Sequence, residues 1–266
     1  MPPDPCTAIR RISNYVARWI QLQQNVGEES ITDWLLYESA RRIPQIAYRK
    51  FTRSEEAKES GADFDWCLLT SRRCLTFRVQ SKRAPGNTDL YPSIAYSNRH
   101  GLQIERLIEA SRSDNVRPTY AFYTDPIPGT PFGCQFASKA GPRTGAFLAP
   151  AGWVYHTFVV PARSQVMREN LLGKSIPLEC LACCHLAQKS LDQFLQAYFA
   201  QVDANAGADI SSNLGVSDAP PGWASALLQE SLQRGASNTS VPDWWDREYA
   251  HLAARTGAVL VWDLRR

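Results

Sequence analysis

The sequence predicts an α/β protein in which helices cover the faces of a mixed β-sheet. Segments with apolar residues at helical spacing alternate along the chain with strand-like segments. Two strand-like segments, residues 63–69 and 74–82, are joined by the short polar stretch TSRR, which is typical of an antiparallel hairpin. A helical segment then leads from the hairpin to a further strand, and such a crossover packs its helix against the sheet.

The first two elements are expected to be helices. Residues 7–24 repeat apolar side chains at helical spacing, which indicates one amphipathic helix. A second helix is expected after Gly27, because Ser30 and Asp33 have the spacing of a capping box. Pro44 ends this second helix, since the residue before a proline disfavours helical geometry.

The strands and the crossover helix follow. Alternating apolar and polar residues predict strands at residues 45–52, 63–69 and 74–82, a helix at 103–111 and an aromatic-rich strand at 119–125.

These elements divide the chain into three parts of one domain. We expect an N-terminal helix in residues 1–26, a core in residues 27–125 and a largely helical C-terminal elaboration in residues 126–266. The last part ends in the strand-like stretch AVLVWDL, and the pattern leaves open whether this strand joins the same sheet. It also gives no role for residues after Asp125.

The composition is that of a globular, cytoplasmic protein. Hydrophobic residues make up 44% of the 266 residues, enough for one sizeable core. A net charge of +3 permits nucleic-acid binding without arguing for it. Seven irregularly spaced cysteines, and an N-terminus without a signal-peptide pattern, predict reduced thiols. We expect no membrane-spanning helix, because prolines interrupt the most apolar stretch.

The register of the hairpin decides which side chains meet. If the turn is centred between Ser71 and Arg72, Asp63 lies opposite Gln80, and Lys82 shares their face. A slip of one residue would send these side chains to different faces. The same register places Asp65 opposite another strand residue, Arg78, with which we expect it to form an ion pair.

These residues have the chemistry of a divalent-cation site. The Asp63 carboxylate and the Gln80 amide oxygen are hard donors that suit Mg²⁺ or Mn²⁺, and a backbone carbonyl near Ser81 could add another. Lys82, expected to be exposed at the strand end, could activate a water or neutralise charge that develops on a phosphate. The alternative is a half-buried strand with a solvated polar face.

Asp63 followed by Gln80-Ser81-Lys82, after an acid-bearing helix and before a helix and a strand, resembles the PD-(D/E)XK nuclease superfamily. Its core has the order α-β-β-β-α-β. Glutamine in place of the second acid is similar to the QxK variant in the Mrr-like branch of restriction nucleases and in bacterial antiviral effectors. The resemblance covers residues 27–125. It implies a restriction-endonuclease-like, nuclease-type core that cleaves DNA with Mg²⁺ or Mn²⁺ through Asp63, Gln80 and Lys82.

The resemblance also implies a further acid from the first core helix. Glu29 is the best match, as both a catalytic and a metal-binding residue, with Glu28 and Asp33 as competitors. Glu29 could equally be a helix-start carboxylate favoured by the helix dipole. The amide of Gln80 removes one negative charge beside the cation, so a lower metal affinity is expected and a non-cleaving site stays open.

The implied setting is bacterial defence against foreign DNA. Candidate partners are DNA and either a second copy of the chain or another defence protein. Two alternatives stay open: a catalytically silent module that binds nucleic acid or protein, and a delivered antibacterial DNase toxin. Candidate nucleic-acid contacts are Arg72, Arg73, Lys82, Arg83 and Arg99.

The motif CLACCH raises the question of zinc. Cys180 and Cys183 have a ligand spacing, but no second pair follows, and small buried thiols on an apolar helix explain the motif better. The sequence contains neither a Walker-type phosphate loop nor a GxGxxG segment, so no nucleotide cofactor is expected.

Overall fold

The computed structural model describes residues 4–51, 60–84, 89–125, 144–162, 166–183, 185–233 and 250–265. Its helices are α1 (Pro5–Leu22), α2 (Glu28–Arg42), α3 (Gln103–Ser113), α4 (Ala151–Val154), α5 (Arg168–Leu172), α6 (Cys180–Cys183), α7 (His185–Asn205) and α8 (Gly222–Gln233), with a π-helical turn at Tyr155–Val159. Its strands are β1 (Ile46–Lys50), β2 (Phe64–Leu69), β3 (Cys74–Arg83), β4 (Ser97–Asn98), β5 (Gly101–Leu102), β6 (Arg117–Tyr123), β7 (Ala146–Pro150), β8 (Ile176–Pro177), β9 (Val216–Ser217) and β10 (Ala258–Asp263). None of the described helices is long and apolar enough for a bilayer span.

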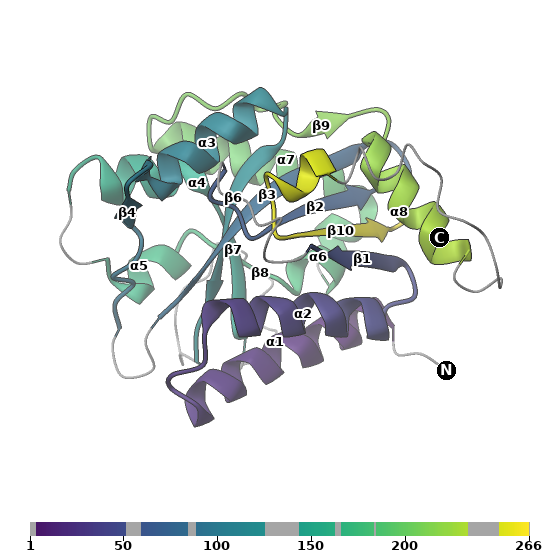
Figure 1. The fold of residues 1–266 in the computed structure, drawn as a ribbon, viewed down its shortest axis with the longest axis horizontal. Coiled ribbons are helices and arrows are strands. Elements are labelled where there is room, and N and C mark those ends of the chain that lie inside the picture. Colours follow the sequence, from purple (N-terminus) through teal and green to yellow (C-terminus); the bar gives the residue numbers. More distant parts are fainter. Residues whose placement is uncertain are drawn as a thin grey trace.

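One mixed sheet forms the centre of the molecule, which confirms the predicted α/β class. Its strand order is β1-β10-β2-β3-β6-β7-β8, and β9 pairs with β3 (Figure 1). The strand near the C-terminus, β10, lies between β1 and β2 and runs parallel to β2. Its residues are all buried, as expected for a central strand covered on both faces. The segment after residue 125 therefore supplies strands as well as helices.

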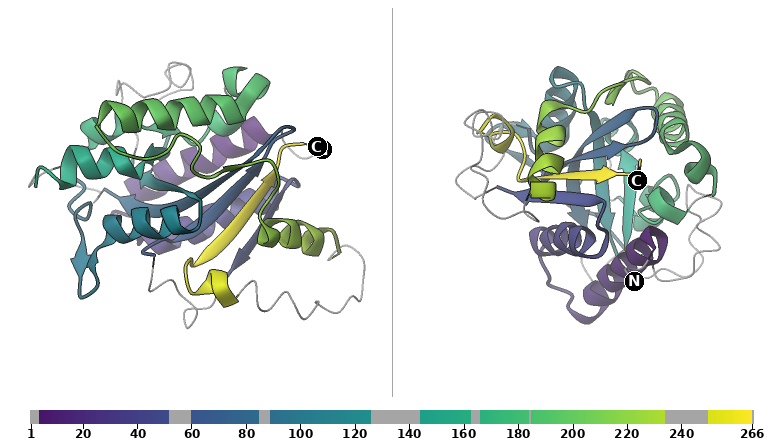
Figure 2. Two further views of the ribbon diagram at one scale, coloured as in Figure 1. Left: turned by 90° about the horizontal axis from the view of Figure 1, so that it is seen from above. Right: turned by 90° about the vertical axis from the view of Figure 1, so that its right-hand side faces the viewer.

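Helices cover both faces of this sheet (Figures 1 and 2). On one face, α1 and α2 bury an apolar stripe against β2 and β3, with Phe64, Trp66 and Val79 in the same core. On the other face, α3 and α4 pack against the aromatic residues of β6, and α8 packs against β10. The crossover helix α3 thus lies on the face opposite α2.

α2 begins directly after Gly27, as predicted, but its capping differs from the prediction. The helix begins at Glu28 with Gly27 as its N-cap, and no side chain caps it, so the predicted capping box at Ser30 is wrong. Two glutamates in the first turn favour this start instead, because carboxylates stabilise the positive end of the helix dipole. Thr32 fixes the helix to the sheet: its hydroxyl lies 3.0 Å from the Ser81 hydroxyl of β3 and 3.0 Å from the Tyr123 hydroxyl of β6.

The hairpin has the predicted register. Phe64 pairs with Val79, and Asp65 pairs with Arg78. The Arg78 guanidinium donates to both carboxylate oxygens of Asp65, at 3.0 and 2.8 Å, and both side chains are buried. The prediction that Asp65 forms an ion pair across the hairpin is therefore confirmed.

One disulfide corrects the prediction of reduced thiols. Cys6 at the start of α1 is bonded to Cys183 at the end of α6, with their Cα atoms 4.8 Å apart. The two residues are 177 positions apart, so their spacing in the sequence carried no signal. Cys67 and Cys74 are buried free thiols, and Cys180 is also buried.

Candidate active site

The site is built where β3 continues beyond the start of β2. The hydrogen-bonded pairing of β2 begins at Phe64, opposite Val79, whereas β3 runs on to Arg83 and pairs with β6 on its other side. The N–H and C=O groups of Ser81 therefore face the side on which β2 has ended. The Asp63 carboxylate occupies this position, and its Oδ2 accepts the Ser81 N–H at 2.6 Å.

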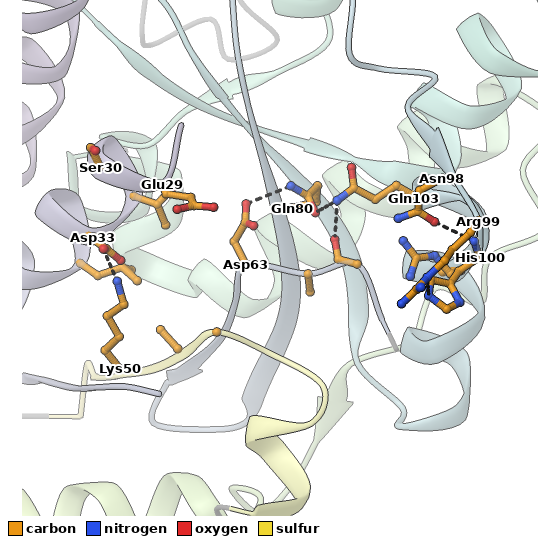
Figure 3. Close-up of a pocket in the computed structure, with 17 residues that line it drawn as sticks. Glu29, Ser30, Asp33, Lys50, Asp63, Gln80, Asn98, Arg99, His100 and Gln103 are labelled. Carbon is orange, nitrogen blue, oxygen red and sulfur yellow. Dashed lines mark hydrogen bonds and ion pairs between the residues drawn. The ribbon is translucent and has the colours of Figure 1, made fainter. Parts of the chain in front are cut away.

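Gln80 brings a second polar group to the same place. Its Nε2 donates to Asp63 Oδ2 at 3.0 Å (Figure 3) and to the Ser81 carbonyl at 2.9 Å. Its Oε1 accepts from Nε2 of Gln103, the first residue of α3, at 2.6 Å. Asp63 and Gln80 thus meet as their register predicts, but the amide presents its nitrogen to the carboxylate and its oxygen to Gln103.

Lys82 is not the exposed strand-end residue that the sequence predicts. Only 5% of its surface is accessible, and its Nζ lies 5.8 Å from the centre of the Tyr96 ring. Its ammonium charge favours the ionised forms of both Asp63 and Glu28. The strand pattern could not show this burial, because the covering residue lies on a different segment of the chain.

The three candidate acids of α2 differ in position. Glu29 lines the same cavity as Asp63 and Gln80 and extends from the helix toward Asp63 (Figure 3). Glu28 is half-buried and is close enough to Asp63 to raise its pKa. Asp33 forms an ion pair with Lys50 of β1. Glu28 and Glu29 therefore both remain candidates for completing the site, whereas Asp33 already has a cationic partner.

Burial dominates the electrostatics of the two inner acids. It raises the pKa of Asp63 to about 6, against the opposing effects of the Ser81 N–H and the Lys82 ammonium, and the Glu28 carboxylate adds to the rise. Burial also raises the pKa of Glu28, which Lys82 and the Arg83 backbone N–H partly counteract. A protein site that holds two such carboxylates near one ammonium favours an additional cation or proton.

A cavity of about 680 Å³ opens over these groups. Glu29 and Asp33 of α2 lie on one side of it, and Arg99 and His100 lie on the other side (Figure 3). Arg106 also lines the cavity. Arg99 and His100 form the turn between β4 and β5, where the Arg99 Nε donates to the His100 ring at 2.9 Å (Figure 3). The cavity thus has an acidic side that could hold a cation and a basic side that could hold an anion.

The donor atoms fit Mg²⁺ or Mn²⁺. The Asp63 carboxylate and the Ser81 carbonyl are hard oxygen donors, and a half-turn of the Gln80 amide would add its oxygen beside them. The Glu28 Oε2 atom is buried and has no hydrogen-bond partner among the described residues. Within those residues, no cluster of three His, Cys, Asp or Glu side chains could hold a metal. A cation here would therefore depend on amide and carbonyl oxygens as well as carboxylates.

The remaining basic candidates lie elsewhere. Arg72 and Arg73 are at the hairpin turn, at the end of β3 away from Gln80. The Arg83 guanidinium donates to the Gln24 and Ala84 carbonyls. Of the predicted arginine contacts for nucleic acid, Arg99 is the one that lines the cavity.

The CLACCH motif shows no zinc-like arrangement in the described residues. Cys183 is bonded to Cys6, and Cys180 is buried. Cys134, which could have supplied a distant ligand, lies outside the described residues.

A family model matches residues 5–256, and its description is "Family of unknown function (DUF6615)". The chain belongs to this family. No curated protein and no solved structure matches the chain. The candidate site residues from Glu28 to Tyr120 lie within the part of the chain that matches DUF6615, whereas Gly257 and Ala258, which also line the cavity, lie just beyond it.

Two site residues carry no signal in the sequence. Gln103 contacts Gln80 because the β4–β5 hairpin returns the chain to the sheet at the start of α3. Tyr120 of β6 pairs with Gln80 of β3. Its buried hydroxyl has no hydrogen-bond partner among the described residues. Burial raises the pKa of Tyr120, and Asp63 and Glu28 raise it further, so the phenol stays protonated. Only the three-dimensional arrangement places these two side chains at the site.

Proposed function

We propose that this protein is a metal-dependent nuclease that hydrolyses DNA phosphodiester bonds through a restriction-endonuclease-like core. One observation carries the proposal. Asp63 meets Gln80 and Ser81 near the end of β3, the Lys82 charge acts on Asp63, and a glutamate-bearing helix lines the same cavity. This is the set of groups that the motif's resemblance to the PD-(D/E)XK superfamily implies.

The cation-binding role falls to oxygen donors. Asp63, the Gln80 amide oxygen and the Ser81 carbonyl would hold Mg²⁺ or Mn²⁺, with Glu29 reaching in from α2. When bound, such an ion polarises a phosphate and lowers the pKa of water. Asp63 must lose its proton to take part, and its raised pKa of about 6 allows this at neutral pH.

Lys82 and the basic wall act on the substrate. The Lys82 ammonium, whose charge already acts on Asp63, would stabilise negative charge that develops at the reacting phosphate, and its low exposure would make this interaction stronger than it would be in water. Arg99 and His100 face the acids across the cavity, so they would contact the phosphate backbone of the bound strand. These roles require the substrate to enter between the two walls.

The biological setting follows the family resemblance: cytoplasmic defence against foreign DNA, with DNA as the substrate and a second copy of the chain or a defence protein as partner. One observation favours a second candidate, a delivered antibacterial DNase toxin. The Cys6–Cys183 disulfide is typical of proteins that meet an oxidising compartment. Phage plating on cells that express the protein, compared with killing of neighbouring cells, separates the two settings.

The test of the activity is incubation of the purified protein with plasmid DNA and Mg²⁺ or Mn²⁺, followed by the same assay with EDTA. Asp63→Asn should abolish cleavage, because the amide replaces an ionised ligand with a neutral one. Asp33→Asn is the matched control: it removes a carboxylate from the same cavity, one that already pairs with Lys50. Equal cleavage by wild type and Asp63→Asn would exclude this site as the catalytic centre.

A further inference from the structure

Three acceptor atoms fix the orientation of two amides at the site. Asp63 Oδ2 and the Ser81 carbonyl both face the Gln80 amide, so its nitrogen must point to them. The Gln80 oxygen then faces Gln103, which must present its own nitrogen, and the Gly61 carbonyl at 3.2 Å requires the same orientation of Gln103. The two side chains therefore form one directional chain of hydrogen bonds.

Gln103 lies in close contact with Gly61. Gly61 has a φ of +70°, and a Cβ atom there would lie 2.9 Å from the Gln103 Cγ. The absence of a side chain at Gly61 therefore allows its backbone to lie this close to Gln103. Its Oε1 is buried and has no hydrogen-bond partner among the described residues.

A divalent cation bound to Asp63 and the Ser81 carbonyl would require the opposite orientation of the Gln80 amide. The amide nitrogen would face a positive charge, so the amide must turn and offer its oxygen. Its nitrogen then faces Gln103, whose nitrogen must turn away because two donors cannot share a hydrogen bond. After both turns, the Gln80 nitrogen donates to the Gln103 Oε1, which gains the partner that it lacks, and the Gly61 carbonyl loses its donor.

We propose that Gln80 and Gln103 form a two-amide switch in which Gln103 is a positioning residue that sets the cation affinity of the site. The proposal rests on the metal site of the proposed function, but it concerns binding alone. In the cation-free orientation the pair satisfies Asp63, Ser81 and Gly61. In the cation-bound orientation Gln103 holds the Gln80 oxygen toward the ion.

The direct measurement follows both side-chain amides by NMR during a Mg²⁺ titration. Glutamine-labelled full-length protein is used, and the Gln80→Glu and Gln103→Glu variants assign the two amide signals by their loss. Both signals should move with one common midpoint as Mg²⁺ binds. If the Gln80 signal moves while the Gln103 signal stays, or if Mg²⁺ binds and moves neither, the switch is excluded.

A variant tests the control of affinity. Gln103→Glu can only accept, so it should turn the Gln80 oxygen toward Asp63 before the ion arrives. Asn98→Asp is the charge-matched control, because it adds one negative charge to the same cavity while its oxygen can still accept the His100 N–H. By calorimetry, Gln103→Glu should bind Mn²⁺ about tenfold more tightly than Asn98→Asp, the equivalent of about one oriented hydrogen bond.

The outcomes separate this proposal from the proposed function. Mg²⁺ binding that moves both amide signals, together with plasmid DNA that stays intact, supports the switch and contradicts the nuclease. Cleavage of DNA with equal Mn²⁺ affinity in Gln103→Glu and Asn98→Asp contradicts the switch and supports the nuclease. A protein that binds neither ion at any concentration tested contradicts both.

Discussion

The raised pKa of Asp63 predicts a measurable loss of stability as the pH rises. The change to test is Asp63→Asn, followed across pH. A single oxygen, Oδ2, accepts both the Ser81 N–H and the Gln80 Nε2–H, so an asparagine oxygen in that position can keep both hydrogen bonds. The substitution therefore removes the titrating charge with little change in shape.

The magnitude follows from linkage between protonation and folding. The pKa of Asp63 is raised from 3.8 to about 6, and one pH unit of difference corresponds to about 1.4 kcal/mol, so the effect is about 3 kcal/mol. The folded protein binds this proton more tightly than the unfolded chain does. The contribution is thus fully present below about pH 4 and is lost as the pH rises through about 6.

The assay is urea unfolding, followed by tryptophan fluorescence, of both proteins between pH 4 and pH 8. The difference in unfolding free energy between wild type and Asp63→Asn should change by about 3 kcal/mol in favour of the variant as the pH rises. The comparison is needed because burial also raises the pKa of Glu179 to about 7 and that of Asp203 to about 6. Their contributions are common to both proteins and cancel.

Mg²⁺ supplies the second half of this test. Because the ion requires the ionised carboxylate, it should restore stability to wild type above pH 6 and have little effect at pH 4.5. Asp63→Asn should gain much less at either pH. A free-energy difference that stays constant across pH would refute the reasoning, since Asp63 would then titrate as it does in the unfolded chain.

Three further predictions concern single side chains. Lys82→Met should lower cleavage by about 10²–10³-fold and also lower the melting temperature, because it removes the buried cation that favours ionised Asp63; nicking assays and thermal unfolding measure the two effects. Gln80→Glu should bind Mn²⁺ more tightly in calorimetry, and equal or weaker binding would contradict the assigned ligand set. Cys6→Ser should lower the unfolding free energy by about 2–4 kcal/mol in non-reducing buffer, with no difference once reductant has opened the Cys6–Cys183 bond in wild type.

The hairpin could be predicted because its geometry is local. A short turn between two strands fixes the register, and the register fixes which side chains share a face. Asp65 therefore meets Arg78, and Asp63 meets Gln80, as the residue numbers alone indicate. The mixed sheet and its crossover helix follow from the same local patterns.

The remaining features depend on contacts between distant segments. The position of β10 between β1 and β2 joins residues that are about two hundred positions apart, and no periodicity in either segment records the pairing. Lys82 looks like an exposed strand end, but the segment that carries Tyr96 covers it. Gln103 gives no sign of its role, because its partner atom lies on β3 and its orientation depends on the Gly61 carbonyl.

The glutamine at position 80 has a physical explanation in this arrangement. A glutamate there would direct a third carboxylate at Asp63 Oδ2 and the Ser81 carbonyl, beside the half-buried Glu28, with one lysine nearby. Such a site would be strained by like charges until a cation arrived. The amide instead donates to both acceptors, so the protein can fold without the ion and still offer an oxygen after a half-turn. The cost is weaker binding, since one negative charge is missing. On this argument the Gln80→Glu variant should be less stable than wild type without the ion. Its melting temperature should rise more than that of wild type when Mn²⁺ is added.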